Sequence, residues 1–375
     1  HKERFFKANS TDILKLRASV GYIGKANFDP SQALTTYQYN PSLNYNKGIG
    51  AIPITIGNTD LKWERTLNWN FGVDMTLFKN LDLTLDYYRK ITDNLLLDVA
   101  KAPSIGVETS TENVGKINNT GIDFSLRVVP IQNQNWNWAL NLTMSHNKNE
   151  IKEISNALKT LNDKNNAQDS RTPQPVYVEG ESLSAIKVVK STGIDPATGS
   201  EVYVKQDGSL TFDFDYNDKR VYGDQDPKVY GAFGSYLMYK GFSLNLLFSY
   251  RLGATLYNET LVTRVEGADP KKNADKRVFT SRWQKAGDRT KYKNIADSNI
   301  PKQTSRFIED EYRLEMTSIN AGYDFKPDFL KKLHLRQLRL EFLMNDLFNL
   351  SSIKQERGLD YPFARSFEFS VRATF

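Results

Sequence analysis

The feature that most constrains this chain is an alternation of apolar and polar residues that recurs in ten segments. In residues 67–77 every odd position is apolar, and the even positions carry asparagine, glycine, aspartate or threonine. Successive side chains of a β-strand point to opposite faces, so the pattern predicts strands with one apolar and one polar face. The other segments are residues 14–22, 81–87, 122–128, 136–144, 229–239, 242–252, 312–325, 335–346 and 366–375.

The length of these segments bears on where such strands lie. Most are about nine to twelve residues long, which is the length that a strand needs to cross a bilayer at a tilt. No stretch of about 18 apolar residues is present, so a transmembrane helix is excluded. The mean hydropathy of −0.55 is low for a membrane protein, but strands that are apolar on one face only keep it low. The sequence therefore predicts an all-β protein, an antiparallel transmembrane β-barrel.

Short and long connections alternate between the expected strands. Short periplasmic turns and long extracellular loops are typical of outer-membrane barrels. With the C-terminus on the periplasmic side, every short link falls on that side. We expect short links at residues 78–80, 130–134, 239–241 and 326–333, and long ones at residues 23–63, 92–114, 148–228, 253–311 and 347–365. Residues 201–205 and 210–214 predict a hairpin around an Asp-Gly turn, and residues 326–333 predict a helical turn.

The chain ends on the stretch FEFSVRATF, whose odd positions are all apolar. Soluble domains usually end on disposable polar residues, so this ending favours a last membrane strand. Its final residue, Phe375, also resembles the aromatic signal that outer-membrane barrels present to their insertion machinery.

The composition argues against several other classes of function. Cysteine is absent, which excludes disulfides and thiolate metal sites. The 50 Lys and Arg and 44 Asp and Glu residues leave a net charge of +6, and the cations are scattered, which favours a solvated surface over nucleic-acid binding. The three histidines lie far apart in this topology, and phosphate-loop and zinc spacings are missing. We expect no cofactor, no metal and no catalytic residue.

Nine stretches, spread over nearly the whole chain, carry a resemblance to a known family. They are LKLRASVGYIGKANF, GNTDLKWERTLNWNFGVDMTLFKNLDLTLDYYRKITDNLL, NVGKINNTGIDFSL, TGIDPATGSEVYVKQDG, YGDQDPKVYGAFGSYLMYKGFSLNLLFSYRLG, RWQKAGD, SRFIEDEYRLEMTSINAGYDF, LRLEFLMNDLFNL and GLDYPFARSFEFSVRATF. In this order they resemble the SusC/RagA family of TonB-dependent outer-membrane transporters.

The resemblance implies that residues 1–375 are the C-terminal part of a barrel of about 22 strands, whose plug, TonB box and first half are not in this sequence. It also implies energised import of oligosaccharides or oligopeptides across the outer membrane. The implied partners are a SusD-like surface lipoprotein, TonB acting through the absent N-terminal region, the remaining barrel and plug, outer-membrane lipid and lipopolysaccharide, and an oligomeric nutrient.

Two alternatives stay open. Ten strands can close into a small barrel of their own, which would act as a surface enzyme or an adhesin. A SusC-like barrel could also serve as a scaffold in a surface complex without transport. The many charges on the polar strand faces favour a wide barrel around a polar plug over a narrow filled one.

Charged residues on the polar strand faces are expected to point into the lumen, because a cation facing mid-bilayer lipid costs about 2–4 kcal/mol. There they would contact the plug and line the substrate path, or pair with one another in a wet lumen. They are Arg17, Asp74, Asp86, Asp123, Arg127, Arg251, Arg339, Glu341 and Arg372.

Aromatic residues in the long loops are the candidates for substrate contact, because a flat ring can stack on a sugar face or a peptide plane. Packing between loops is the alternative for each of them. They are Tyr37, Tyr39, Tyr45, Tyr216, Tyr222, Tyr257 and Trp283. Loop aromatics suit glycans and peptides alike, so they leave the class of substrate open.

Overall fold

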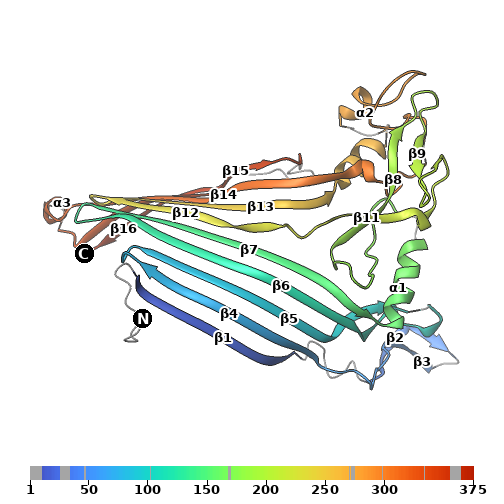
Figure 1. The fold of residues 1–375 in the computed structure, drawn as a ribbon, viewed down its shortest axis with the longest axis horizontal. Coiled ribbons are helices and arrows are strands. Elements are labelled where there is room, and N and C mark those ends of the chain that lie inside the picture. Colours follow the sequence, from blue (N-terminus) through green and yellow to red (C-terminus); the bar gives the residue numbers. More distant parts are fainter. Residues whose placement is uncertain are drawn as a thin grey trace.

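A ten-stranded antiparallel sheet dominates the computed structural model. The structure describes residues 11–25, 34–45, 48–101, 103–167, 170–269, 271, 275–297, 299–332, 334–354 and 365–375. The strand order is β1-β4-β5-β6-β7-β12-β13-β14-β15-β16, so consecutive membrane strands are neighbours. The long strands run side by side and curve into part of a barrel wall (Figure 1). The prediction of an antiparallel barrel-type fold is confirmed.

Each of the ten alternating segments corresponds to one strand of this sheet, and three of them (312–325, 335–346 and 366–375) extend past it by one or two residues. The strands are β1 (Thr11–Lys25), β4 (Glu64–Leu77), β5 (Leu81–Ala100), β6 (Thr109–Gln132), β7 (Trp136–Ile154), β12 (Val229–Tyr239), β13 (Phe242–Tyr257), β14 (Ile308–Asp324), β15 (Gln337–Ser351) and β16 (Phe367–Thr374). Among the described residues no pairing joins β1 to β16. The sheet is therefore open, and the alternative of a closed ten-stranded barrel is not what the strands form.

The register keeps one face of the sheet apolar across all ten strands. Phe124 pairs with Met144, and Phe233 pairs with Phe248, whose ring stacks on it at 4.6 Å between centroids. A bulge between Met316 and Ser318 shifts the phase of β14 by one residue and keeps its apolar side chains on this face on either side of the bulge.

The short turns gather at the end of the sheet where the chain terminates (Figure 1). Phe78 and Lys79 have φ values of 52° and 60°, and Lys240 and Gly241 have 46° and 94°. Lys240 and Gly241 form a two-residue connection, in which two positive φ values match the twist of a hairpin. Residues 78–80 form a three-residue connection between the paired Leu77 and Leu81. The helical turn predicted nearby is confirmed as α3 (Pro327–Lys332).

Several predicted connections are too long, because the strands continue past their alternating segments. The loops expected at residues 148–228, 253–311 and 347–365 are shortened in this way by β7, β13, β14 and β15. Two further connections are also shorter than predicted. The long loop expected at residues 92–114 is mostly strand, because β5 and β6 stay paired up to Ala100 and Thr109. Bulges between Thr92 and Leu96 end the simple alternation there. Helix α1 (Asn156–Ala167) then covers one side of the pair. The turn expected at residues 130–134 is shorter, since β6 continues to Gln132.

The far end of the sheet carries the remaining small elements (Figure 1). The predicted hairpin is confirmed, since Val204 of β9 pairs with Leu210 of β10, and it belongs to a four-stranded sheet of order β10-β9-β8-β11. Two strands of that sheet and the separate β2–β3 hairpin were not predicted. The elements are β2 (Thr36–Tyr45), β3 (Gly48–Thr55), η2 (Pro103–Ile105), β8 (Ala185–Ile194), β9 (Glu201–Val204), β10 (Leu210–Thr211), η3 (Tyr216–Asp218), β11 (Lys219–Asp224), η4 (Leu261–Glu266), α2 (Arg277–Thr280) and η5 (Ser305–Phe307).

None of the helices in the described part of the chain is long and apolar enough to span a membrane.

Candidate functional site

Ion pairs that reach across three strands organise the polar face of the sheet. Arg17 on β1 donates to both oxygens of Asp74 on β4 at 2.8 Å, and to Asp86 on β5 at 2.9 Å. Gly72 lies between Arg17 and Asp86 in the register. A Cβ on Gly72 would stand 2.5 Å from Asp86 Oδ1 and 2.7 Å from Arg17 Cζ. The missing side chain is therefore what lets Arg17 cross β4.

A similar arrangement of an arginine beside a glycine occurs near the other edge of the sheet. Arg339 on β15 donates to Asp324 at 2.5 Å and to Glu341 at 2.7 Å. A Cβ on Gly322 of β14 would stand 2.8 Å from Ser243 Oγ and 2.9 Å from Arg339 Nη2. Arg339 Nη2 also donates to Ser243 Oγ on β13 at 3.3 Å. Each of the two arginines thus passes a glycine to reach a partner on the strand beyond it.

The other charged residues expected in the lumen lie on the same polar face. The register places Asp123 opposite Asp86, Arg127 opposite Asp82, and Arg372 opposite Arg339. Arg251 lies 3.7 Å from Glu311, which was not predicted. Glu311 is fully buried and also pairs with Arg313 at 2.7 Å. That this face contacts a plug or a substrate stays a prediction.

A buried charge cluster joins two long loops at the opposite end from the turns. Arg306 Nε and Nη2 donate to the Glu201 carboxylate at 2.6 and 2.7 Å, and its Nη1 and Nη2 donate to Glu266 at 2.8 and 2.7 Å. All three side chains are nine-tenths or more buried. Burial disfavours the Arg306 charge, but the two carboxylates outweigh it and raise its pKa. Sequence analysis missed this cluster, because Glu201 lies far along the chain from its partners.

Further contacts make these two loops a single folded unit (the described residues of 156–224 and 261–307). It is here called the extracellular body, after the side on which the sequence predicts these loops. The backbone N–H of Val189 donates to Gln303 O at 3.0 Å, and Trp283 Nε1 donates to Pro196 O at 2.9 Å. Gly199, with φ of +74°, lies against the Trp283 ring, where a Cβ would come within 2.6 Å. A small core of Val262, Val265, Tyr292 and Phe307 fills the second loop.

Four of the aromatic candidates are half-buried in or next to this body. Trp283 packs as described, and Tyr257 donates from its hydroxyl to Arg171 O at 3.0 Å. Tyr216 packs edge-on against Phe214, with ring centroids 4.9 Å apart. Tyr222 lines a cavity of about 570 Å³ between β11 and the upper ends of β7 and β13. These contacts provide the packing role named as the alternative, and substrate contact by these four residues stays a prediction.

Tyr37 and Tyr39 behave differently, because they lie on the β2–β3 hairpin with 63% and 75% of their surfaces exposed. Tyr45 ends strand β2, and its side chain is outside the described part. Phe375, the expected assembly signal, follows β16 and is also exposed; its role stays a prediction.

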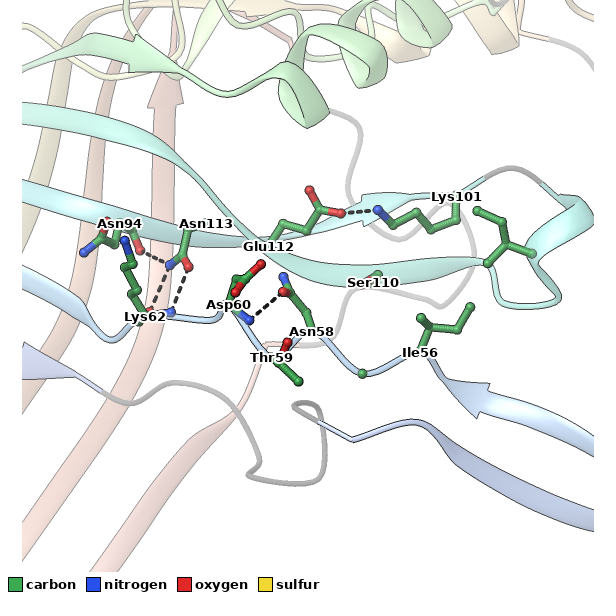
Figure 2. Close-up of a pocket in the computed structure, with 12 residues that line it drawn as sticks. Ile56, Asn58, Thr59, Asp60, Lys62, Asn94, Lys101, Ser110, Glu112 and Asn113 are labelled. Atoms are coloured by element: carbon green, nitrogen blue, oxygen red, sulfur yellow. Dashed lines mark hydrogen bonds and ion pairs between the residues drawn. The ribbon is translucent and has the colours of Figure 1, made fainter.

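A polar cavity of about 740 Å³ adjoins this hairpin (Figure 2). Its wall includes residues 56–60, which directly follow β3, and the upper ends of β5 and β6. Asn113 Nδ2 donates to Lys62 O and Asn94 O at 2.9 Å, and Lys62 N donates back to Asn113 Oδ1 at 2.9 Å. Lys101 and Glu112 form an ion pair on the same wall. The volume is in the range of small-ligand pockets, and the lining offers both donors and acceptors.

No group of three or more metal-binding side chains occurs within the described ranges.

Residues 7–266 match the family "TonB dependent receptor-like, beta-barrel". The chain belongs to this family. Its members are outer-membrane receptors, so the apolar face of the sheet is the lipid-facing one. The TonB-dependent receptor P39 of Formosa agariphila is 26% identical over 92% of the chain and 37% of its own length. The TonB-dependent receptor SusC of Bacteroides thetaiotaomicron is 28% identical over 68% of the chain and 26% of its own length. The chain thus spans about a third of these relatives or less.

Solved structures agree on the fold of this receptor barrel. The RagAB peptide transporter superposes with a TM-score of 0.78 at 20% identity, over 94% of this chain and 39% of that one. The RagAB peptide importer in its "open-open" state gives 0.79 at 20% identity, over 98% and 41%. The prediction that this chain is part of a SusC/RagA-type barrel is confirmed.

Proposed function

We propose that this chain is the C-terminal part of the barrel wall of a transporter that imports oligosaccharides or oligopeptides through the outer membrane. The observation that carries the proposal is the division of the molecule into two parts. One is a wall whose polar face is held by arginine contacts that span three strands: ion pairs for Arg17, and an ion pair with a hydrogen bond for Arg339. The other is a folded body at the loop end. A wide barrel needs the first around its plug, and a capture chamber needs the second.

The partners follow from the same proposal. A SusD-like surface lipoprotein would close over the extracellular body, and TonB would act on the plug through a region outside this sequence. The names of the relatives SusC and RagAB support this arrangement. In this proposal the chain's own contribution is binding and gating, through the polar face of the wall and the loops above it.

Within this framework we propose that Tyr37 and Tyr39 contact the oligomer and that the adjoining cavity holds one of its units. The exposed rings supply stacking surface, and the Asn, Lys and Glu side chains of the cavity supply hydrogen bonds. Glycan and peptide chains both present flat faces and polar edges, so both classes should be tested.

Uptake by cells that produce the full-length protein tests the transport proposal. Fluorescent oligosaccharides and oligopeptides should accumulate in the periplasm, and a protonophore or loss of TonB should abolish accumulation. If the oligomer is cleaved at the surface and does not enter, the transport proposal is wrong and the surface-enzyme alternative is favoured. Surface binding that never leads to entry would favour the adhesin or the scaffold.

A double variant, Tyr37→Ala with Tyr39→Ala, tests the contact proposal. Loss of two stacking rings should weaken oligomer binding by about tenfold to a hundredfold, as expected for aromatic anchors worth about 1–3 kcal/mol together. Phe212→Ala removes a 57% exposed ring that follows β10 in another loop and serves as the matched control. Titration calorimetry measures the affinity for the oligomer. An equal loss of affinity in the double variant and in Phe212→Ala would contradict a specific role of the hairpin.

A further inference from the structure

A row of cations lies on the lipid-facing side of the sheet, where only apolar residues are expected. The register places Trp69, Arg89, Thr120 and Lys148 side by side across β4, β5, β6 and β7. In β4, Arg65 has the same parity as Trp69 and thus points to the same side. These cations therefore project from the apolar face and not into the lumen.

The cations form one loosely paired cluster. The Arg65 guanidinium lies 5.0 Å from the Tyr22 ring centroid and 3.9 Å from Asp93. Arg89 Nε donates to Asn118 at 3.0 Å, an uncharged partner. Arg65, Arg89 and Lys148 are exposed.

Acidic residues compensate the cluster only in part. Lys116 pairs with Asp93 at 3.0 Å, and Lys152 pairs with Glu150 at 2.5 Å. The register places Glu153 opposite Lys116. The five cations of β4–β7 at this level therefore face three carboxylates, which leaves a charge of +2 (five minus three).

The height of this cluster matches the outer edge of the bilayer. Arg65 lies twelve residues from Leu77 at the turn end of β4 (77 minus 65), and Lys148 lies twelve from Trp136 at the turn end of β7 (148 minus 136). At about 3.3 Å per residue and a tilt of about 40°, twelve residues rise about 30 Å, just above an apolar band of about 25 Å. Arg65 and Lys148 thus stand at the level of the outer-leaflet headgroups. Arg89 lies lower, eight residues from Leu81 at the turn end of β5 (89 minus 81), which is a rise of about 20 Å. Its guanidinium extends along the strand pair to Asn118, as long cationic side chains near a membrane edge do.

The corresponding part of the other half of the sheet lacks this charge. At the same end, the lipid-facing side chains of β13 and β14 include Tyr250, Leu252, Tyr312 and Leu314. The described residues of these two strands place no lysine or arginine on that face. The cations are therefore a local feature of β4–β7 and not a girdle around the wall.

We propose that Arg65, Arg89 and Lys148, here called the basic row, bind the phosphate groups of a phosphorylated glycolipid of the outer leaflet, of the lipid A type. Guanidinium and ammonium groups are the usual donors to phosphate. Exposed apolar side chains on the same face offer the acyl chains a surface that a free phosphate ion would not use. Val20 and Trp69 are in register with Arg89, and Phe71 lies one step nearer the turns. The binding is independent of transport and of the substrate.

The full-length protein, purified in mild detergent and placed in nanodiscs, tests this proposal. Native mass spectrometry should show phosphorylated lipid A retained by the wild type and not its dephosphorylated form. The double variant Arg89→Gln with Lys148→Gln should lose about fivefold in retention per cation, since each cation near an anionic surface is worth about 1 kcal/mol. The matched control is Lys90→Gln, since Lys90 neighbours Arg89 but points to the polar face.

Three results would overturn the proposal. One is equal retention by the double variant and by Lys90→Gln, and another is equal affinity for dephosphorylated lipid A. The third is stabilisation of the wild type by inorganic phosphate alone, which would mean a free-anion site. If the double variant fails to fold, as judged by loss of heat-modifiable gel mobility, the wild type is tested at rising salt. Retention that does not fall with salt would then contradict a phosphate contact.

Discussion

The wall and the extracellular body are stabilised in opposite ways, although they belong to one chain. The wall leaves large side chains exposed on one face, such as Phe369 at 73% and Phe71 at 52%, and its ion pairs stay half-exposed on the other face. The body does the reverse, since it buries the Arg306 cluster and a small apolar core. The wall is organised by backbone pairing and by lipid, whereas the body is organised by its own interior. Changes that disturb one should therefore leave the other intact.

The largest effect is expected for Arg306→Ala, which would leave Glu201 and Glu266 buried without their cation. Removing one partner of a buried ion cluster destabilises by about 3–5 kcal/mol. We expect fast hydrogen exchange and new protease sites in the body, while the wall keeps its heat-modifiable gel mobility. Arg289→Ala, at an exposed arginine of the same loop, should have little effect.

A rescue experiment sharpens the Arg306 prediction. Arg306→Met combined with Glu201→Gln and Glu266→Gln removes all the charges of the cluster together. Most of the body's protection from hydrogen exchange and proteolysis should therefore return. Loss of folded wall together with the body in Arg306→Ala would mean that the two regions are not independent.

A smaller effect is expected in the wall from Gly72→Ala. The new methyl group would collide with Arg17 and Asp86, and overpacking of this kind costs about 1–3 kcal/mol. Gly21→Ala on the neighbouring strand meets no atom within 4 Å, so it should be neutral or slightly stabilising. Urea unfolding of the two variants in detergent gives the comparison, and equal midpoints would show that the Arg17 bridge contributes nothing.

The last prediction concerns pH and Lys219 in the body, whose pKa burial lowers from 10.5 to about 8. The unfolded chain keeps this proton up to about pH 10.5, while the folded body releases it near pH 8. The body should therefore become more stable as pH rises between these values, and the buried charge should lower its stability below pH 8. NMR of ¹³C-methylated lysines should show one midpoint near 8, and a midpoint near 10.5 would contradict the burial.

The wall was predictable because its signal is local. The alternation of Leu67 to Leu77 alone decides which side chains share a face, and the glycine and lysine turns mark where strands reverse. Where both faces are covered, as at Leu97 under α1, the alternation disappears and the predicted strand ended too early. The body could not be predicted, because its parts are held by contacts between distant segments such as Glu201 and Arg306.

The basic row was predictable only in part. Arg89 and Lys148 each break the apolar face of one strand, which is visible in the sequence, but only the pairing register brings them to one side and one level.

The sequence by itself determined the class of the protein, the number of strands in the main sheet and the polarity of each face, because two-residue periodicity is a property of each strand alone. Only the tertiary structure decided that two loops form one body, that Gly72 and Gly322 let arginines cross a strand, and that the cations of β4–β7 stand together. The reason is physical: those features depend on which strands and loops meet, and that is set by hydrogen-bond register and by packing over long separations in the chain.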